Sequence, residues 1–223
     1  RRPGKPSGFA PSAPVTRYGL VFAGLGDGLW YALDQATGRV RWKARGLPAG
    51  SGAPAARTGD GPDRAGGPGA EALPAPVAYD GLVYFCESGG MRAVEARTGA
   101  PVWQVAPEEG LGSPVASEGI LYCGSARGAL AVEAKTGAVV WKALLDGPVV
   151  QPVALGDGRL YAVTETGTLW ALDALTGAAL WQAAADPCAP VFAELLVVVG
   201  GRAVDALTGE QVWRRPDLQT AAA

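Results

Sequence analysis

Apolar and polar residues follow one pattern that recurs along the chain. The segment ALDQATGRVRW, residues 32–42, contains a short apolar strand, a Thr-Gly turn and a second short strand that ends in tryptophan. The same pattern returns at residues 93–103, 131–141, 171–181 and 203–213. Strands and turns at a regular spacing are typical of repeat architectures, so the pattern predicts a repeated unit of β-structure.

A second marker sets the length and content of the unit. Pro-Val pairs begin at Pro14, Pro76, Pro114, Pro152 and Pro190, and the last three intervals are 38 residues each. In each unit we expect four short strands: the Pro-Val strand, an apolar strand such as LVFAG or RLYAV, the Ala-x-Asp/Glu strand and the strand ending at Trp. Four strands joined by tight turns make one antiparallel blade. The sequence therefore predicts an all-β fold, a β-propeller of five blades or an arc of a larger propeller.

The Thr-Gly turn explains its own composition. A hairpin loop of about four or five residues needs a residue with a positive φ angle, which glycine adopts without strain. The carboxylate three positions before each Thr can accept hydrogen bonds within the turn, so we interpret it as a brace rather than an acid or base. These carboxylates are Asp34, Glu95, Glu133, Asp173 and Asp205.

Composition divides the chain into a linker, a repeat region and a tail. Residues 1–12 are rich in Pro, Gly and basic residues, which is typical of a linker, and they include neither a Met start nor an apolar signal segment. We therefore expect a longer gene product; a cytoplasmic location is favoured, and an extracytoplasmic one stays open if a signal lies upstream. Between Trp42 and Pro76 lie 33 residues, against 10 between Trp103 and Pro114, and this predicts a disordered insertion at 46–75. The β-propeller is expected over 13–215, with repeats at about 13–45, 75–106, 113–144, 151–184 and 189–215, and a tail at 216–223.

Composition also narrows the chemistry that the chain can perform. The 223 residues are 48% hydrophobic, enough to bury a core, and the net charge of -2 with scattered basic residues predicts no nucleic-acid partner. The longest apolar run, LLVVV at residues 195–199, is far shorter than the roughly 20 residues that span a bilayer, so we expect no direct membrane insertion. The absence of histidine excludes a Ser-His-Asp triad, a Cys-His pair and the commonest metal ligand. Cys86, Cys123 and Cys188 form no Cys-x-x-Cys pair, so we interpret them as buried thiols.

The repeated Ala-x-Asp-x-x-Thr-Gly-x-x-x-Trp segment resembles the tryptophan-docking motif of the pyrroloquinoline quinone (PQQ)-like β-propeller repeat family. The resemblance covers nearly the whole chain from Ala13 to Trp213. It implies that each tryptophan is wedged between the first Ala of its motif and the glycine of a neighbouring blade. It also places in structural roles Ala32, Gly38, Trp42, Ala93, Gly99, Trp103, Ala131, Gly137, Trp141, Ala171, Gly177, Trp181, Ala203, Gly209 and Trp213.

The resemblance leaves three functional classes to consider. A PQQ-dependent dehydrogenase is disfavoured, because there is no adjacent cysteine pair and no carboxylate cluster that fits calcium, so we expect neither PQQ nor calcium as a cofactor. A sensor propeller would resemble those C-terminal to bacterial serine/threonine kinases, which fits the linker-like start. A scaffold would resemble BamB, the propeller lipoprotein of outer-membrane protein assembly. We favour the noncatalytic sensor, with the scaffold as its alternative.

Ligand contacts are expected at one end of the blades. The turn between the second and third strands and the connection into the first strand emerge at the same end, because adjacent strands are antiparallel. A protein or small-molecule partner would therefore meet the polar residues of these turns. The candidates for ligand contact are Asp27, Glu87, Arg127 and Glu165.

Overall fold

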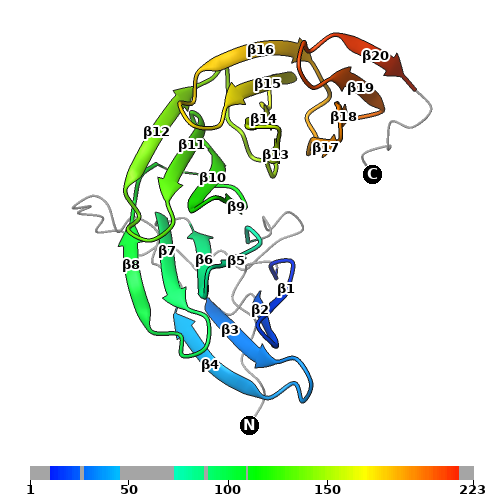
Figure 1. Ribbon diagram of the computed structural model, residues 1–223. Helices are drawn as coiled ribbons and strands as arrows, with labels where there is room; N and C mark the ends of the chain where they lie inside the picture. The colour runs from blue at the N-terminus through cyan, green and yellow to red at the C-terminus, as the bar shows by residue number, and fades with distance from the viewer. Residues whose placement is uncertain (1–10, 26–27, 46–72, 88–89, 109, 216–223) are drawn as a thin grey trace, which may run out of the picture. The chain divides into compact units, whose positions relative to one another are not determined.

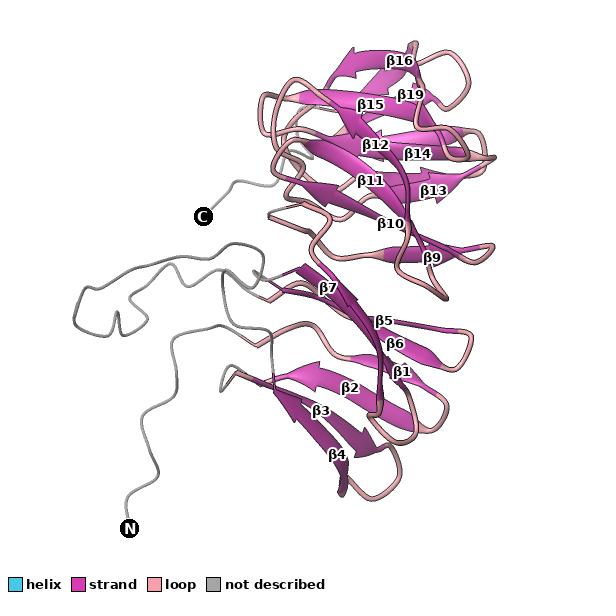
Figure 2. Cartoon of the chain, turned by 90° about the vertical axis from the view of Figure 1, so that its left-hand side faces the viewer, coloured by secondary structure: helices cyan, strands magenta, loops and turns pink. Residues whose placement is uncertain are grey.

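The chain folds into four-stranded antiparallel sheets. The computed structural model describes residues 11–25, 28–45, 73–87, 90–108 and 110–215. These residues form twenty strands in five sheets, each with its strands adjacent in chain order (Figure 1). Every element within them is a strand, loop or turn (Figure 2), so none is a long apolar helix that could cross a membrane. The predicted all-β class and the four-stranded antiparallel blade are confirmed.

Three predicted segments lie largely or wholly outside the described residues. They are the linker at 1–12, of which 11 and 12 are described, the insertion at 46–75, of which 73–75 are described, and the tail at 216–223. The described residues fall into two compact units, within residues 1–109 and 110–223.

The first unit contains two blades. The strands of its first blade are β1 (Val15–Arg17), β2 (Leu20–Gly24), β3 (Leu29–Asp34) and β4 (Val40–Arg45). Those of its second blade are β5 (Val77–Tyr79), β6 (Leu82–Glu87), β7 (Gly90–Glu95) and β8 (Pro101–Val105). The inner strands β1 and β5 lie beside each other, so the two sheets face one another.

The second unit contains three blades. Its third-blade strands are β9 (Val115–Ser117), β10 (Ile120–Ser125), β11 (Gly128–Glu133) and β12 (Val139–Leu144). The fourth blade consists of β13 (Ala154–Gly156), β14 (Arg159–Val163), β15 (Thr168–Asp173) and β16 (Ala179–Ala184). The fifth consists of β17 (Val191–Ala193), β18 (Leu196–Val199), β19 (Arg202–Asp205) and β20 (Gln211–Arg214).

A two-residue turn joins the first two strands of each blade and fixes their register. Tyr18, Asp80, Glu118 and Asp157 have φ angles between 46° and 56°, and each is followed by a glycine that also has a positive φ. Two positive φ angles in succession are the signature of the type I′ turn, whose twist matches that of the strands it joins. The fifth blade departs from this pattern, because Leu195 follows Glu194 in place of glycine.

Each blade carries one row of four side chains across a single face, because residues paired across antiparallel strands point the same way. The row starts on the inner strand, passes the first Ala of the motif and ends at the motif tryptophan. In the first four blades the second member is aromatic and lies close to that tryptophan, with ring centroids 5.8–6.0 Å apart. The rows are Val15-Phe22-Ala32-Trp42, Val77-Tyr84-Ala93-Trp103, Val115-Tyr122-Ala131-Trp141, Ala154-Tyr161-Ala171-Trp181 and Val191-Val198-Ala203-Trp213.

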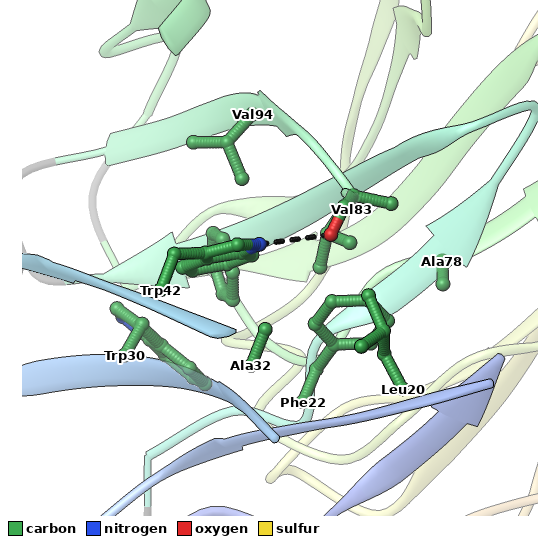
Figure 3. Packing of buried hydrophobic residues seen from close by; sticks show 10 residues of the cluster. Leu20, Phe22, Trp30, Ala32, Trp42, Ala78, Val83 and Val94 are labelled. Atoms are coloured by element: carbon green, nitrogen blue, oxygen red, sulfur yellow. Dashed lines mark hydrogen bonds between the residues drawn. The ribbon is translucent and has the colours of Figure 1, made fainter. Parts of the chain in front are cut away.

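The hydrophobic cores lie between neighbouring blades. In the first unit, Phe22 and Trp42 of the first blade pack into one buried cluster with Val83, Phe85 and Val94 of the second (Figure 3). The second unit repeats this arrangement twice, with Trp141 packed toward the fourth blade and Trp181 toward the fifth. A blade is thus stabilised through its neighbour rather than through a core of its own.

Replacing Trp141 by alanine should destabilise the protein far more than replacing Glu165 by alanine. Trp141 is 8% exposed, and truncating a buried tryptophan costs about 3–5 kcal/mol. Glu165 is an exposed turn residue, where substitutions usually change stability by less than about 0.5 kcal/mol. Urea denaturation followed by circular dichroism would measure both changes, and equal midpoints for the two variants would contradict the packing described here.

Candidate functional site

One connection in the second unit joins the predicted loop residues of two blades. The backbone N–H of Leu145 donates to the carbonyl of Arg127 at 3.1 Å, and that of Glu165 donates to the carbonyl of Pro148 at 2.9 Å. Residues 145–149, which lead from β12 toward β13, therefore bridge the β10–β11 turn and the β14–β15 turn. Arg127 and Glu165 are both exposed, on either side of this connection.

Asp146 is the centre of this connection. Its Oδ2 accepts hydrogen bonds from Thr166 Oγ1 at 2.9 Å and Thr168 Oγ1 at 2.6 Å. Its Oδ1 accepts one from the Nε1 of Trp170 at 2.8 Å. Thr164, fully buried, adds a hydroxyl contact of 2.7 Å to Thr166. We call Asp146, Thr164, Thr166, Thr168 and Trp170 the Asp146 site.

In the Asp146 site, uncharged hydrogen-bond donors stabilise the ionised form of the Asp146 carboxylate. Desolvation raises the pKa of Asp146, but the hydrogen bonds from Thr168, Trp170 and Thr166 outweigh it and lower the pKa to about 2. The carboxylate is thus ionised across the physiological pH range. Its three donors carry no charge, so its negative charge is retained at the loop end beside the ring of Trp170, which is partly exposed.

Glu87 occupies a different environment in the first unit. It ends β6 rather than standing in an open turn, and its side chain is 5% exposed. The Nε1 of Trp30, from the neighbouring blade, donates to Glu87, and the guanidinium Nη2 of Arg92 lies 3.4 Å from its Oε1. Arg92 also lies over the ring of Phe85, with 5.3 Å from Cζ to the ring centroid. Glu87 is therefore a buried, paired carboxylate.

The structure brings together two of the four predicted loop candidates. Arg127 and Glu165 flank the Asp146 site, whereas Glu87 belongs to the other unit and is buried. Asp27 lies outside the described residues. The use of any of these residues in ligand contact stays a prediction.

Sequence reasoning missed Asp146 and the two tryptophans outside the docking motif. Trp30 and Trp170 lie within the first three residues of the third strand of their blades, and each donates its indole N–H to a carboxylate from another segment. A signal was present, because five of the seven tryptophans end a motif and these two do not. Both precede an Ala-Leu-Asp segment, in LWYALD and LWALD.

The motif tryptophans that face a neighbour within their unit share one contact. The indole Nε1 of Trp42 donates to the carbonyl of Ala96 in the next blade at 2.9 Å (Figure 3). Trp141 donates in the same way to Ala174 at 2.9 Å, and Trp181 to Ala206 at 3.2 Å. The ring covers the glycine of that blade's Thr-Gly turn: a Cβ on Gly99, Gly177 or Gly209 would lie 2.6–2.7 Å from it.

The Asp and Glu carboxylates of the Thr-Gly turns accept different sets of hydrogen bonds. Asp34 Oδ1 accepts from both the backbone N–H and the hydroxyl of Thr37, and Asp173 and Asp205 accept the same pair from Thr176 and Thr208. In the described structure, Glu95 and Glu133 accept only the threonine hydroxyl. The shorter aspartate side chain therefore accepts a hydrogen bond from the backbone of the turn as well.

The described residues do not fit PQQ with calcium. A calcium ion needs several oxygen ligands that converge on one point. Within the described ranges no three His, Cys, Asp or Glu residues gather closely enough to hold a metal. Glu87 and Asp146 already accept hydrogen bonds from indoles and other donors, and none of the chain's three cysteines is adjacent to another.

Known structures with this architecture are β-propellers. BamB from Moraxella catarrhalis superposes with a TM-score of 0.68 and 23% identity, over 91% of this chain and 59% of its own. The computationally designed Ika8 protein has a TM-score of 0.69 and 20% identity, over 93% and 62%. Quinohemoprotein alcohol dehydrogenase from Comamonas testosteroni has a TM-score of 0.70 and 16% identity, over 94% and 43%. This chain thus spans about six-tenths of the first two structures, and it is built of PQQ-like propeller blades.

The sequence itself assigns the family. Residues 87–221, more than half of the chain, match the family described as outer membrane protein assembly factor BamB. The chain belongs to this family of PQQ-like propeller repeat proteins, as the docking motif predicted. No curated protein sequence matches it.

Replacing Glu87 by alanine should destabilise the first unit strongly. The change would leave the Arg92 guanidinium, whose side chain is 12% exposed, without its carboxylate, and breaking a buried ion pair costs about 3–5 kcal/mol. Glu165→Ala is the matched control, since that carboxylate is exposed in the corresponding turn of the fourth blade. Chemical denaturation would compare them. A Glu87→Ala variant as stable as the control would show a solvated carboxylate at this position.

Replacing Asp146 by asparagine should destabilise the protein at neutral pH and less so in acid. Its folded pKa of about 2 lies below the unfolded value of about 3.9, so its stabilising effect is present above pH 4 and is lost as the pH falls toward 2. Melting temperatures of both proteins from pH 7 to pH 2 would measure this.

The difference between the two melting curves is the informative quantity. Asp34, Asp173 and Asp205 also have lowered pKa values, so the wild-type curve alone does not isolate Asp146. We expect the two melting temperatures to converge in acid. A constant difference down to pH 2 would contradict the assigned ionisation.

Proposed function

We propose that this chain is a noncatalytic propeller domain that binds a partner protein through the loop end of its blades. The observation that carries the proposal is the Asp146 site: Asp146 accepts a hydrogen bond from the partly exposed Trp170, and the connection that carries Asp146 is bonded to the turns of the exposed Arg127 and Glu165. Tryptophan and arginine are enriched among the residues that dominate protein interfaces. Family membership supports the same conclusion, since the family is described as an assembly factor.

Hydrogen bonds already hold the Asp146 site in place, which makes it a better candidate for partner binding than a loop without such bonds. Asp146 accepts three hydrogen bonds, and the backbone of residues 145–149 is bonded to the turns on both sides. A surface that is already ordered loses little conformational entropy when a partner binds. The fixed carboxylate and the exposed Arg127 offer both signs of charge, which sets the orientation of a partner more than its affinity.

A finer proposal joins this propeller to a serine/threonine kinase domain that it regulates. It is supported by the resemblance of the repeats to kinase-linked propellers and by the Pro, Gly and basic residues at 1–12. The alternative is a free-standing scaffold resembling BamB. The mass of the native gene product separates the two, because a kinase domain adds roughly 30 kDa to the 22.6 kDa of this chain.

Site-specific crosslinking in the source cells tests the loop-end proposal. A photo-crosslinking amino acid at Glu165 should give a discrete protein adduct, and Trp170→Ala should reduce its yield. The control position is Leu175, which is 75% exposed in the Thr-Gly turn at the opposite end of the same blade. Adducts from position 175 and none from 165 would contradict the proposal. Quinone-dependent dye reduction by the pure chain with added PQQ and calcium would contradict the noncatalytic part.

A further inference from the structure

Three exposed leucines lie at one end of the fourth and fifth blades. Leu175 and Leu207 occupy the Thr-Gly turns of these blades and are 75% and 64% exposed, and Leu195, in the β17–β18 turn, is 71% exposed. Because adjacent strands are antiparallel, both kinds of turn lie at the same end of a blade, opposite the Asp146 site. The backbone N–H of Ala206, next to Leu207, donates to the carbonyl of Leu195 at 2.8 Å. We call Leu175, Leu195 and Leu207 the leucine patch.

Contacts within the second unit hold the two blades of the patch together at this end. The hydroxyl of Tyr161, in the fourth blade, donates to the carbonyl of Ala206 in the fifth at 3.1 Å. The indole Nε1 of Trp181 donates to the same carbonyl at 3.2 Å. The buried core therefore fixes the turn that carries Leu207 against the blade that carries Leu175.

The position within the turn, and not the lack of a neighbouring blade, exposes these side chains. The fourth blade packs against a blade on each side within the second unit, and its Leu175 is the most exposed of the three. Leu207 has the same place in its turn, where the second and third blades have the exposed Arg97 and Lys135. Leu195 stands where the first four blades have glycine. Large apolar side chains thus replace polar or small ones at solvent-facing positions, which is typical of an interaction site.

Carboxylates outnumber basic groups around the leucine patch. The turns at this end of the two blades, residues 155–159, 173–179, 193–196 and 205–210, contain five carboxylates and one guanidinium, those of Asp157, Asp173, Glu194, Asp205, Glu210 and Arg159. Hydrogen bonds within the Thr-Gly turns hold the pKa values of Asp173 and Asp205 below their usual range, and the charge of Arg159 acts in the same direction. At neutral pH the patch is therefore apolar with acidic surroundings.

We propose that the leucine patch binds a basic amphipathic segment of a partner protein. The leucines would be buried against apolar residues of that segment, and its lysine or arginine side chains would face the surrounding carboxylates. Complementary charge speeds association and disfavours acidic partners. The excess of carboxylates also disfavours anionic lipid and a second copy of the same surface as the occupant. The patch is separate from the Asp146 site, so either surface can bind without the other.

A labelled helical peptide of leucine and lysine, with its leucines on one face, is the probe. The same peptide with glutamate in place of lysine is its control. Fluorescence anisotropy with the full chain should show the lysine peptide binding at least about tenfold more tightly than the glutamate peptide. Equal affinity for the two peptides would overturn the proposal.

Substitutions in the patch test whether the leucines make the contact. Leu207→Ala and Leu195→Gly should each weaken binding of the lysine peptide about tenfold, because each removes apolar area that the peptide buries. Both introduce residues that other blades have at these places, Ala36 and Gly158, so we expect the fold to be kept. Leu144→Ala is the matched control, since Leu144 is 76% exposed at the end of β12. Patch variants that bind as tightly as the wild type, or an equal loss in Leu144→Ala, would contradict the assignment.

Two further measurements separate this surface from the alternatives. Leucine-dependent binding to vesicles of phosphatidylcholine and phosphatidylglycerol, with no binding to the peptide, would assign the patch to lipid and overturn the proposal. In the source cells, a protein adduct formed from a crosslinker at Leu175 should persist in Trp170→Ala, whereas the adduct from Glu165 should not. Loss of both adducts in Trp170→Ala would contradict two separate surfaces.

Discussion

The docking of an indole on the neighbouring blade is the contact on which this structure depends. A four-stranded sheet with an apolar face cannot bury that face by itself. In this chain the face is closed by one tryptophan that does two things at once: its ring packs on an aromatic residue of its own blade and its N–H satisfies a backbone carbonyl of the next. A buried carbonyl left without a donor would cost free energy comparable to a lost hydrogen bond. Packing and polar satisfaction therefore select the same arrangement.

The packing of the blades also determines the environment of the side chains at their loop ends. The sheets set the positions of the turns, and connections such as residues 145–149 then bond to the turns of two blades at once. The two indole–carboxylate contacts place their carboxylates in different environments. Glu87 is buried and its charge is offset by Arg92, whereas Asp146 is held by neutral groups near the surface and keeps its charge. The first arrangement stabilises a core, and the second shapes a surface.

Much of the fold could be predicted because each repeat carries the same local sequence signals. The motif Ala and Trp, the Thr-Gly turn and the apolar second strand are local signals, and five copies make them consistent with one another. The Asp146 site could not be found in this way. Asp146 lies 20 residues before Thr166 and 24 before Trp170, in a connection that no motif describes. Glu87 was expected in an open turn, but its burial depends on Trp30 of another blade, which periodicity does not reveal.

The docking contact makes few chemical demands on the sequence. On the receiving blade it uses a main-chain oxygen and a residue that must lack a side chain, so neither the charge nor the size of most neighbouring residues matters to it. Glu95 stands where the other two covered turns have aspartate, and a tryptophan ring covers all three. Most positions of a repeat are thus free to drift over evolutionary time while the contact persists. This is consistent with natural proteins whose structures superpose on more than nine-tenths of the chain while sharing between 12% and 23% of its residues.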